Sequence, residues 1–165
     1  MRKNHGFGVV VSEHAAGEFS ENNILENRRC AVMCGGDSAP CLDMNDISGG
    51  QQGGVWVQDR SKCVLRQNRL FNNRKAALQV SACSDPMVIG NKFFDGKGGG
   101  LVVHEKAMGT FLRNTMSDNQ HAGMRRLCSV CVSCPGSLVC VHELLWCPFQ
   151  HQGDQRGLHR GRDNG

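Results

Sequence analysis

An asparagine column with constant spacing constrains this chain more than any other feature of its sequence. Asn22, Asn45, Asn68, Asn91 and Asn114 follow one another at a constant step of 23 without a gap. Internal repeats of about 20 to 50 residues are typical of solenoids, in which each repeat forms one unit that stacks on its neighbours. The 165 residues are therefore expected to form a stack of similar coils.

Apolar residues keep the same spacing as the asparagines. One apolar column lies two residues after them and another lies three residues before them. Further columns flank one variable position, as in Val55-Trp56-Val57, a pattern typical of a short strand with one buried face. The columns include Ile24, Ile47, Leu70, Phe93 and Met116; Phe19, Leu42, Leu65, Val88 and Phe111; and Val9, Val32, Val55, Leu78 and Leu101.

Stacking is needed because a single unit is too small to bury its own apolar columns. Successive coils would lie ~4.8 Å apart, so equivalent residues would form ladders. A second, looser column places Gly50 and Gly96 where other repeats have asparagine. We expect both columns to occupy sharp corners with positive φ, since Asn and Gly tolerate that conformation. The fold class predicted is all-β, a right-handed parallel β-helix with 23-residue coils.

A leucine-rich repeat is the alternative fold. The segment Phe19-x-x-Asn22-x-Ile24 matches part of that repeat's pattern. Leucine-rich repeats carry a denser run of leucines just before this segment, whereas residues 14–18 read His-Ala-Ala-Gly-Glu. The β-helix is therefore favoured.

The register predicts a β-helix of about five coils over residues 1–124 and an aperiodic tail over residues 125–165. Met1 falls in the column of Ile24, so the pattern starts in mid-coil, which we interpret as a fragment or an alternative start of a longer array. Arg126 places a charge in an apolar column, where the repeat is expected to end. The tail should be partly disordered towards its polar end, and a degenerate sixth coil is the alternative.

Cysteine usage fits reduced thiols better than a disulfide scaffold. The chain has ten Cys, but its start lacks the apolar run of an export signal. In the tail, Cys128, Cys131 and Cys134, followed by Cys140 and His142, have a spacing that could bind zinc. A structural zinc site usually pairs two knuckles separated by a longer loop, so no metal site is predicted. In the body, Cys41 and Cys63 lie on neighbouring coils and are expected to approach each other.

Net charge and hydropathy limit the expected cellular location of the protein and the classes of partner that it can bind. The net charge of +4 is too small to indicate nucleic-acid binding by composition alone. No apolar stretch approaches the ~18 residues of a membrane-spanning helix. We expect a cytoplasmic protein, with the nucleus as the alternative, and neither a membrane nor a nucleic acid as partner.

Three segments resemble a known family. Gly54-Val-Trp-Val57, Asn68-Arg-Leu-Phe-Asn-Asn73 and Gly100-Leu-Val-Val103 resemble the parallel β-helix repeats of F-box only proteins ten and eleven. Those proteins are substrate adaptors of cullin-RING ubiquitin ligases. The resemblance therefore implies the substrate-recognition part of such an adaptor, acting in ubiquitin-dependent protein degradation. The F-box has no counterpart here, so ligase subunits would be reached only through a region absent from this sequence.

A carbohydrate-binding or polysaccharide-cleaving β-helix is the alternative function. Cleavage needs paired carboxylates close to one substrate bond. Glu13, Asp59 and Glu105 share a column but occupy every second coil, ~9.6 Å apart at the ladder spacing. Asp95 and Asp118 lie on adjacent coils at a corner, where a solvated turn explains them. We predict no catalytic residue and no cofactor.

A basic surface is the strongest candidate site. The two columns directly after the second asparagine column contain several Lys and Arg and no acid. One interpretation is a solvated turn whose charges discourage aggregation. The other is a partner-binding surface for an acidic or phosphorylated protein segment; nucleic acid is not expected, because these columns lack aromatic residues. The candidate residues, here called the basic stripe, are Arg28, Arg29, Arg74, Lys75 and Lys97.

Overall fold

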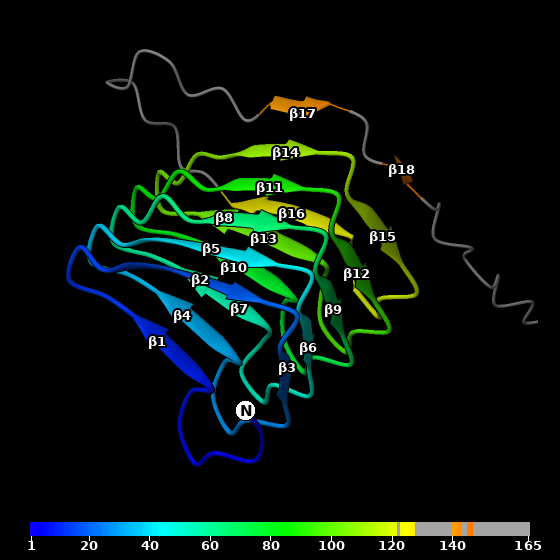
Figure 1. Cartoon of the computed structure of the whole chain (residues 1–165). Coiled ribbons are helices and arrows are strands. Elements are labelled where there is room, and N and C mark those ends of the chain that lie inside the picture. Colours follow the sequence, from blue (N-terminus) through cyan, green and yellow to red (C-terminus); the bar gives the residue numbers. More distant parts are fainter. Residues whose placement is uncertain (122, 128–139, 143–144, 147–165) are drawn as a thin grey trace, which may run out of the picture.

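The chain forms a parallel β-helix, as the repeat predicts. The computed structural model describes residues 1–121, 123–127, 140–142 and 145–146. Each coil contributes one strand to each of three parallel sheets, and strands of one sheet come from successive coils (Figure 1). The expected fold class, with 23-residue coils, is confirmed.

The strands are short because each coil turns three corners. The first sheet contains β1 (Val9–Val11), β4 (Val32–Cys34), β7 (Val55–Val57), β10 (Leu78–Val80), β13 (Leu101–His104) and β16 (Met124–Leu127). The second contains β2 (Ala16–Ser20), β5 (Ala39–Asp43), β8 (Val64–Arg66), β11 (Met87–Ile89), β14 (Thr110–Leu112) and β17 (Cys140–His142). The third contains β3 (Asn23–Leu25), β6 (Asp46–Ser48), β9 (Arg69–Phe71), β12 (Lys92–Phe94), β15 (Thr115–Ser117) and β18 (Leu145–Trp146).

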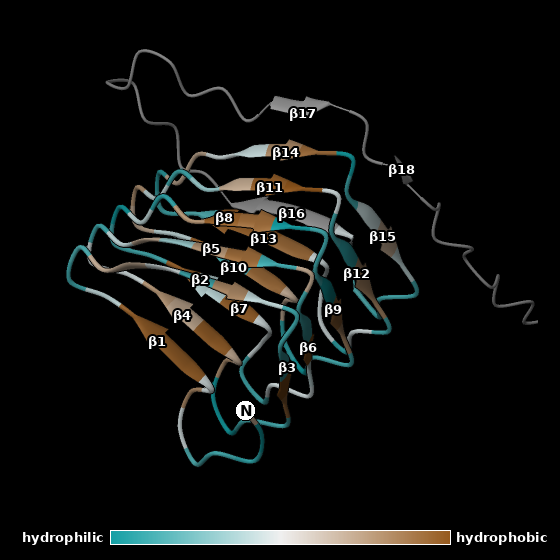
Figure 2. Cartoon of the chain, in the orientation of Figure 1, coloured by the Kyte–Doolittle hydropathy of each residue, from teal (hydrophilic) through white to brown (hydrophobic). Residues whose placement is uncertain are grey.

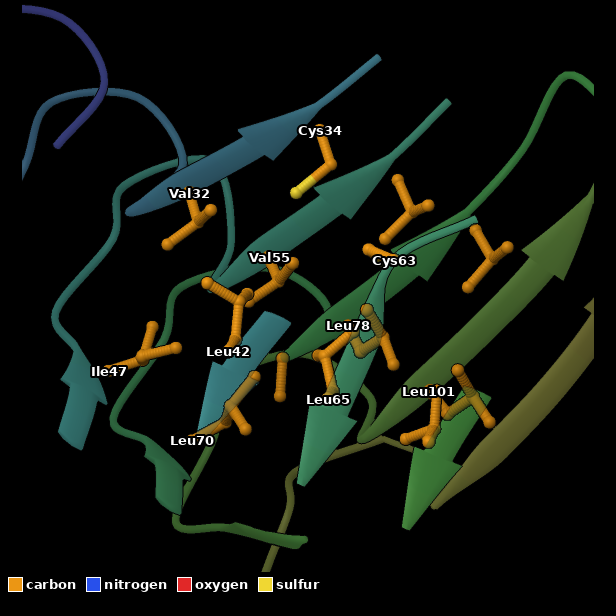
Figure 3. Packing of buried hydrophobic residues seen from close by; sticks show 14 of the residues in the cluster. Val32, Cys34, Leu42, Ile47, Val55, Cys63, Leu65, Leu70, Leu78 and Leu101 are labelled. Atoms are coloured by element: carbon orange, nitrogen blue, oxygen red, sulfur yellow. The ribbon is translucent and has the colours of Figure 1, made fainter. Parts of the chain in front are cut away.

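Columns of the sequence become ladders because residues one repeat apart pair across neighbouring coils. Ile47 pairs with Leu70, and Leu70 pairs with Phe93. All three side chains are completely buried. Side chains from the three sheets converge in one core that runs along the stack (Figure 3). Strands β1, β4, β7, β10 and β13 of the first sheet are largely hydrophobic, whereas the corners between sheets are largely hydrophilic (Figure 2).

The first asparagine column forms a continuous hydrogen-bond ladder. The Oδ1 atom of Asn68 accepts bonds from the backbone N and the Nδ2 of Asn45, both at 2.9 Å. The Nδ2 of Asn68 donates to the carbonyl of Leu42 at 2.8 Å and to Oδ1 of Asn91 at 2.9 Å. The three inner asparagines, Asn45, Asn68 and Asn91, thus tie their coils to both neighbours. The predicted alignment of the five asparagines is confirmed.

The predicted corner conformation of the asparagines is wrong. Positive φ angles occur at the residue before each ladder asparagine, and Gly50 and Gly96 are not among the positive-φ glycines. The amide of a ladder asparagine must reach the backbone of the coils on both sides, so the sharp bend falls one residue earlier. Varied residues adopt that bend: Glu21, Met44, Gln67, Gly90 and Arg113.

Among the described residues, three strands continue the sheets beyond the fifth coil. In β16, Arg126 pairs with Val103, so the first sheet continues through the charged position. In the second sheet, Val141 of β17 pairs with Phe111, a wider separation in sequence than that of Phe111 from its other partner, Val88. A repeat of constant length therefore does not predict the pairing of Phe111 with Val141. The other apolar positions expected for a sixth coil in that register, such as Cys134 and Val139, lie outside the described residues, and the boundary at 124 stays a prediction.

Candidate functional site

The basic stripe lies on the corner between the third and the first sheet. All five of its side chains are exposed. The backbone N of Arg28 donates to Asn4 O at 3.0 Å, that of Arg74 to Gly50 O at 3.0 Å, and that of Lys97 to Asn73 O at 2.9 Å. The turns thus stack one on another, which holds the charged side chains in a line along the coil axis.

Hydrogen bonds of buried polar groups hold the turns of the basic stripe from beneath. Asn73 is completely buried, and its Nδ2 donates to Ile47 O at 3.2 Å while its Oδ1 accepts from the Gly50 N at 3.1 Å. Gly98 follows Lys97, and a Cβ there would collide with the backbone of Lys75. Close packing of the turns therefore explains why the stripe has no side chain at Gly98.

The stripe has two groups of cations. Arg28 and Arg29 lie on one coil, and Arg74, Lys75 and Lys97 lie on two adjacent coils. The coil between the groups carries Gln51 and Gln52, and the Nη1 of Arg74 donates to Oε1 of Gln51 at 3.2 Å. The second group therefore places three positive charges within one step of the stack, about 4.8 Å high.

Within the part of the chain that the structure describes, no stripe residue forms an ion pair. Cations elsewhere do form ion pairs: Arg60 contacts Asp37 at 2.6 Å on the corner between the first and second sheets, and Arg66 contacts Asp43 at 3.2 Å in the second sheet. Arg29 instead lies over the ring of Phe7, with its Cζ 5.3 Å from the ring centroid. The charges of the stripe are thus available to an external anion.

Cys30 lies directly behind the stripe and is buried. Burial raises the pKa of its thiol to about 11, although the positive charge of Lys75 acts in the opposite direction. Cys30 is therefore a neutral, apolar support for the corner and not a nucleophile.

An aromatic patch next to the stripe was missed by the sequence analysis. On the outer face of the third sheet, the rings of Phe71 and Phe94 stack with centroids 5.2 Å apart and an interplanar angle of 11°. The Cζ of Arg69 lies 5.4 Å and 5.8 Å from their centroids. In the sequence, the two phenylalanines occupy the same outward column of the repeat, which is separate from the two stripe columns and reads Leu25, Ser48, Phe71, Phe94 and Ser117. Arg69, Phe71 and Phe94 are called the aromatic patch below.

The acidic columns lie on corners and stay on separate coils. Glu13, Asp59 and Glu105 are exposed with positive φ at the corner between the first and second sheets. Asp95 and Asp118 are exposed with positive φ at the corner just before the stripe columns. Both sets therefore have the placement of solvated turn residues.

The expected approach of Cys41 to Cys63 is not found. Cys41 pairs with Val64, and the one-residue offset places Cys63 on the inner face of the sheet, where it is completely buried. A hydrogen bond with Cys34 and burial raise the pKa of Cys63 well above its usual value. Cys34 and Cys63 both belong to the core cluster (Figure 3).

Metal binding is not indicated where side chains are described. Among those residues, no group of three or more His, Cys, Asp or Glu is arranged to hold an ion. Cys128, Cys131 and Cys134 lie outside the described residues. The same part of the chain contains no helix with the length and apolarity needed to cross a membrane.

The geometry defines a parallel β-helix with an uncompensated basic corner. The chain matches the family described as right handed beta helix region over residues 1–132, and it belongs to that family. Comparison with curated proteins and with solved structures gave no match.

Proposed function

We propose that this β-helix is a protein-binding module whose basic stripe takes an acidic or phosphorylated protein segment. The observation that carries the proposal is the set of five exposed cations on stacked turns, none of them in an ion pair among the described residues. Carboxylates and phosphates form charge-assisted hydrogen bonds with Arg and Lys, and Arg can bind them through two parallel bonds.

We further propose that the module recognises substrates for an F-box adaptor of a cullin-RING ubiquitin ligase. Support comes from the resemblance of residues 54–57, 68–73 and 100–103 to the repeats of F-box only proteins ten and eleven. The β-helix would hold the protein to be degraded, and ligase subunits would bind through a region outside this sequence. The expected location is the cytoplasm.

A charge-reversal experiment tests the binding role. The double variant Arg74→Glu/Lys75→Glu should lose the acidic partners that wild-type chain retains in affinity purification with quantitative mass spectrometry. The control, Lys62→Glu/Lys106→Glu, makes the same change in net charge at exposed positions on the corner between the first and second sheets. Equal partner recovery from wild type and both variants at moderate salt would show that the stripe is only a solvated turn.

The adaptor role needs a separate test. Fusing an F-box to the chain should recruit cullin and linker subunits and shorten the half-life of the partners found with the chain alone. Recruitment of the ligase with unchanged partner half-lives would contradict the adaptor role and leave the binding role intact.

A further inference from the structure

The aromatic patch and the basic stripe are joined by the coil itself. Phe71 precedes Arg74 by three residues, and Phe94 precedes Lys97 by three residues on the next coil. Three residues of chain span at most about 10 Å. Each ring and its cation therefore lie on the two sides of one corner, within reach of a single short peptide.

These two rings lie outside the hydrophobic core. The core positions of the same strands, Leu70 and Phe93, are completely buried, whereas Phe71 and Phe94 face outward and are half-buried. The same outward column holds Ser48 and Ser117 on the coils to either side. The column therefore carries rings on two adjacent coils and serine on the coils beside them, so the two rings form a local surface feature.

The surroundings of the patch favour an anionic partner. Asp46 compensates Arg69 at 3.2 Å, but the exposed Lys92, in register with Arg69, has no ion pair among the described residues. Asp95 is the acid at the corner after Phe94, while the equivalent residue after Phe71 is the neutral Asn72. Asp118, on the next coil, is a second exposed acid in the column of Asp95. The five cations of the stripe and Lys92 outnumber these two acids.

The ring stack also has an open end. Phe94 pairs in register with Ser117, so no ring of this chain continues the stack on the fifth coil. Aromatic rings in proteins gain about 2- to 10-fold in affinity from stacking beyond the burial of their area. An aromatic side chain of a partner could extend the stack while its acidic neighbours contact the stripe.

We propose that the aromatic patch and the basic stripe form one two-part site for an acidic protein segment that carries an aromatic side chain within about three residues of its acidic group. This inference rests on the proposed binding role of the stripe and names the chemistry of its partner. The cations attract and orient the segment, and the rings select among acidic segments. Single-stranded nucleic acid fits less well, since a stacking platform needs rings along the strand. Here the coil of Gln51 and Gln52 separates the stacked Phe71 and Phe94 from a third ring, Phe7, which lies beside Arg29.

The test uses the full chain and three labelled synthetic peptides in fluorescence anisotropy. The first is Glu-Glu-Glu-Ser-Ser-Phe, the second has alanine in place of phenylalanine, and the third has glutamine in place of the glutamates. Wild-type chain should bind the first roughly 3- to 10-fold more tightly than the second and should bind the third weakly. A labelled single-stranded oligonucleotide is measured beside them.

Two variants of the chain show which residues cause the difference in affinity between the first two peptides. Phe94→Ser, which places at this position the residue that the column has on the next coil, should bring the affinity ratio of the first two peptides close to one. Ile89→Ser makes a matched change on the outer face of the second sheet, in a column where Ser20 stands, and should leave the ratio unchanged. Thermal unfolding followed by circular dichroism confirms that both variants are folded.

The other possible results of the peptide experiment contradict either the two-part site or the stripe proposal. Equal affinity of wild type for the first two peptides overturns the two-part site and leaves the stripe proposal standing, and this comparison needs no variant. A ratio that survives Phe94→Ser excludes stacking on Phe94 as its source, and a ratio that survives Phe71→Ser/Phe94→Ser excludes the aromatic patch. Absence of binding to either acidic peptide overturns the two-part site and the binding of carboxylate-bearing segments by the stripe. Tighter binding of the oligonucleotide overturns the choice of a protein partner.

Discussion

At the residue scale, one amide accounts for much of the regularity of this fold. The Nδ2 of Asn91 donates to Leu65 O at 2.9 Å and its backbone N donates to Asn114 Oδ1 at 2.9 Å, so a single residue satisfies polar groups on three coils. The constant spacing predicted this ladder. The bend one residue earlier was not predictable from propensity, because Met44 and Arg113 adopt it as Gly90 does.

Leu70→Asp should unfold the coils. Leu70 is completely buried in the third sheet, and an unpaired carboxylate at this position would destabilise the fold by at least about 4 kcal/mol. Circular dichroism should show loss of the cooperative transition. The control Asn72→Asp changes an exposed corner residue to one that the column already contains at Asp95 and should unfold like wild type. A soluble, cooperatively folded Leu70→Asp chain would contradict the assignment of this column to the core.

Thiol reactivity should follow burial. Cys83 is exposed, whereas Cys30, Cys34 and Cys63 are buried. Since the thiolate is the reactive form, the raised pKa of Cys30, about 11, slows its reaction further. Iodoacetamide at neutral pH should modify Cys83 in the native chain and the buried three only after unfolding, as measured by peptide mass spectrometry. Rapid native modification of Cys63 would mean that the core opens.

At the element scale, the strands were predictable and the composition of the outer faces was not. Alternation of apolar and variable residues identifies strands such as Val55–Val57 and which side chains face the core. It does not show that outward residues of adjacent coils, such as Phe71 and Phe94, meet, because that depends on rotamers and on the guanidinium of Arg69 beside them. The stripe was found because its charges share two columns.

The ion pair of Asp37 with Arg60 should make the stability of the folded chain depend on pH in the acid range. The Nε and Nη2 of Arg60 donate to the two carboxylate oxygens of Asp37 at 2.9 Å and 2.6 Å, and this contact lowers the pKa of Asp37. A lowered pKa in the folded state adds stability above the unfolded pKa of about 3.9, and that stability is lost as the pH falls through the folded value.

Removing the carboxylate should remove this acid-range dependence. Asp37→Asn should lower the melting temperature slightly at neutral pH and converge with wild type in acid, in a series of thermal unfolding curves from neutral to strongly acidic pH. Because the pair is at the surface, the effect should be small and weaker in high salt. A constant difference between the two proteins at all pH values would contradict the electrostatic origin.

At the scale of the whole molecule, the pairing of strands can be predicted from the sequence only while every coil has the same number of residues. Columns at the constant spacing predicted the first five coils. The pairing of Thr115 with Leu145 follows a wider spacing than the pairing of Thr115 with Lys92, and no repeat in the sequence indicates it. Strands β17 and β18 nevertheless cover the edges of β14 and β15.

Removing residues 128–165 should therefore leave the coils folded but more prone to associate. The truncation exposes the edges of β14 and β15, and open strand edges pair readily with other chains. The β-sheet signal in circular dichroism should persist, while light scattering should show larger, concentration-dependent species. Loss of the β-sheet signal in a chain that stays soluble would show that this segment is needed for the stack to fold.

Site-specific photo-crosslinking tests the central claim, that partners bind on the basic stripe, most directly. Gln51 lies between the two groups of stripe cations, and Lys62 is exposed on the corner between the first and second sheets. A photoreactive residue at position 51 should crosslink acidic or phosphorylated partners in cells, and the same residue at position 62 should crosslink few of them. Crosslinks that are equal at both positions, or stronger at position 62, would contradict the account.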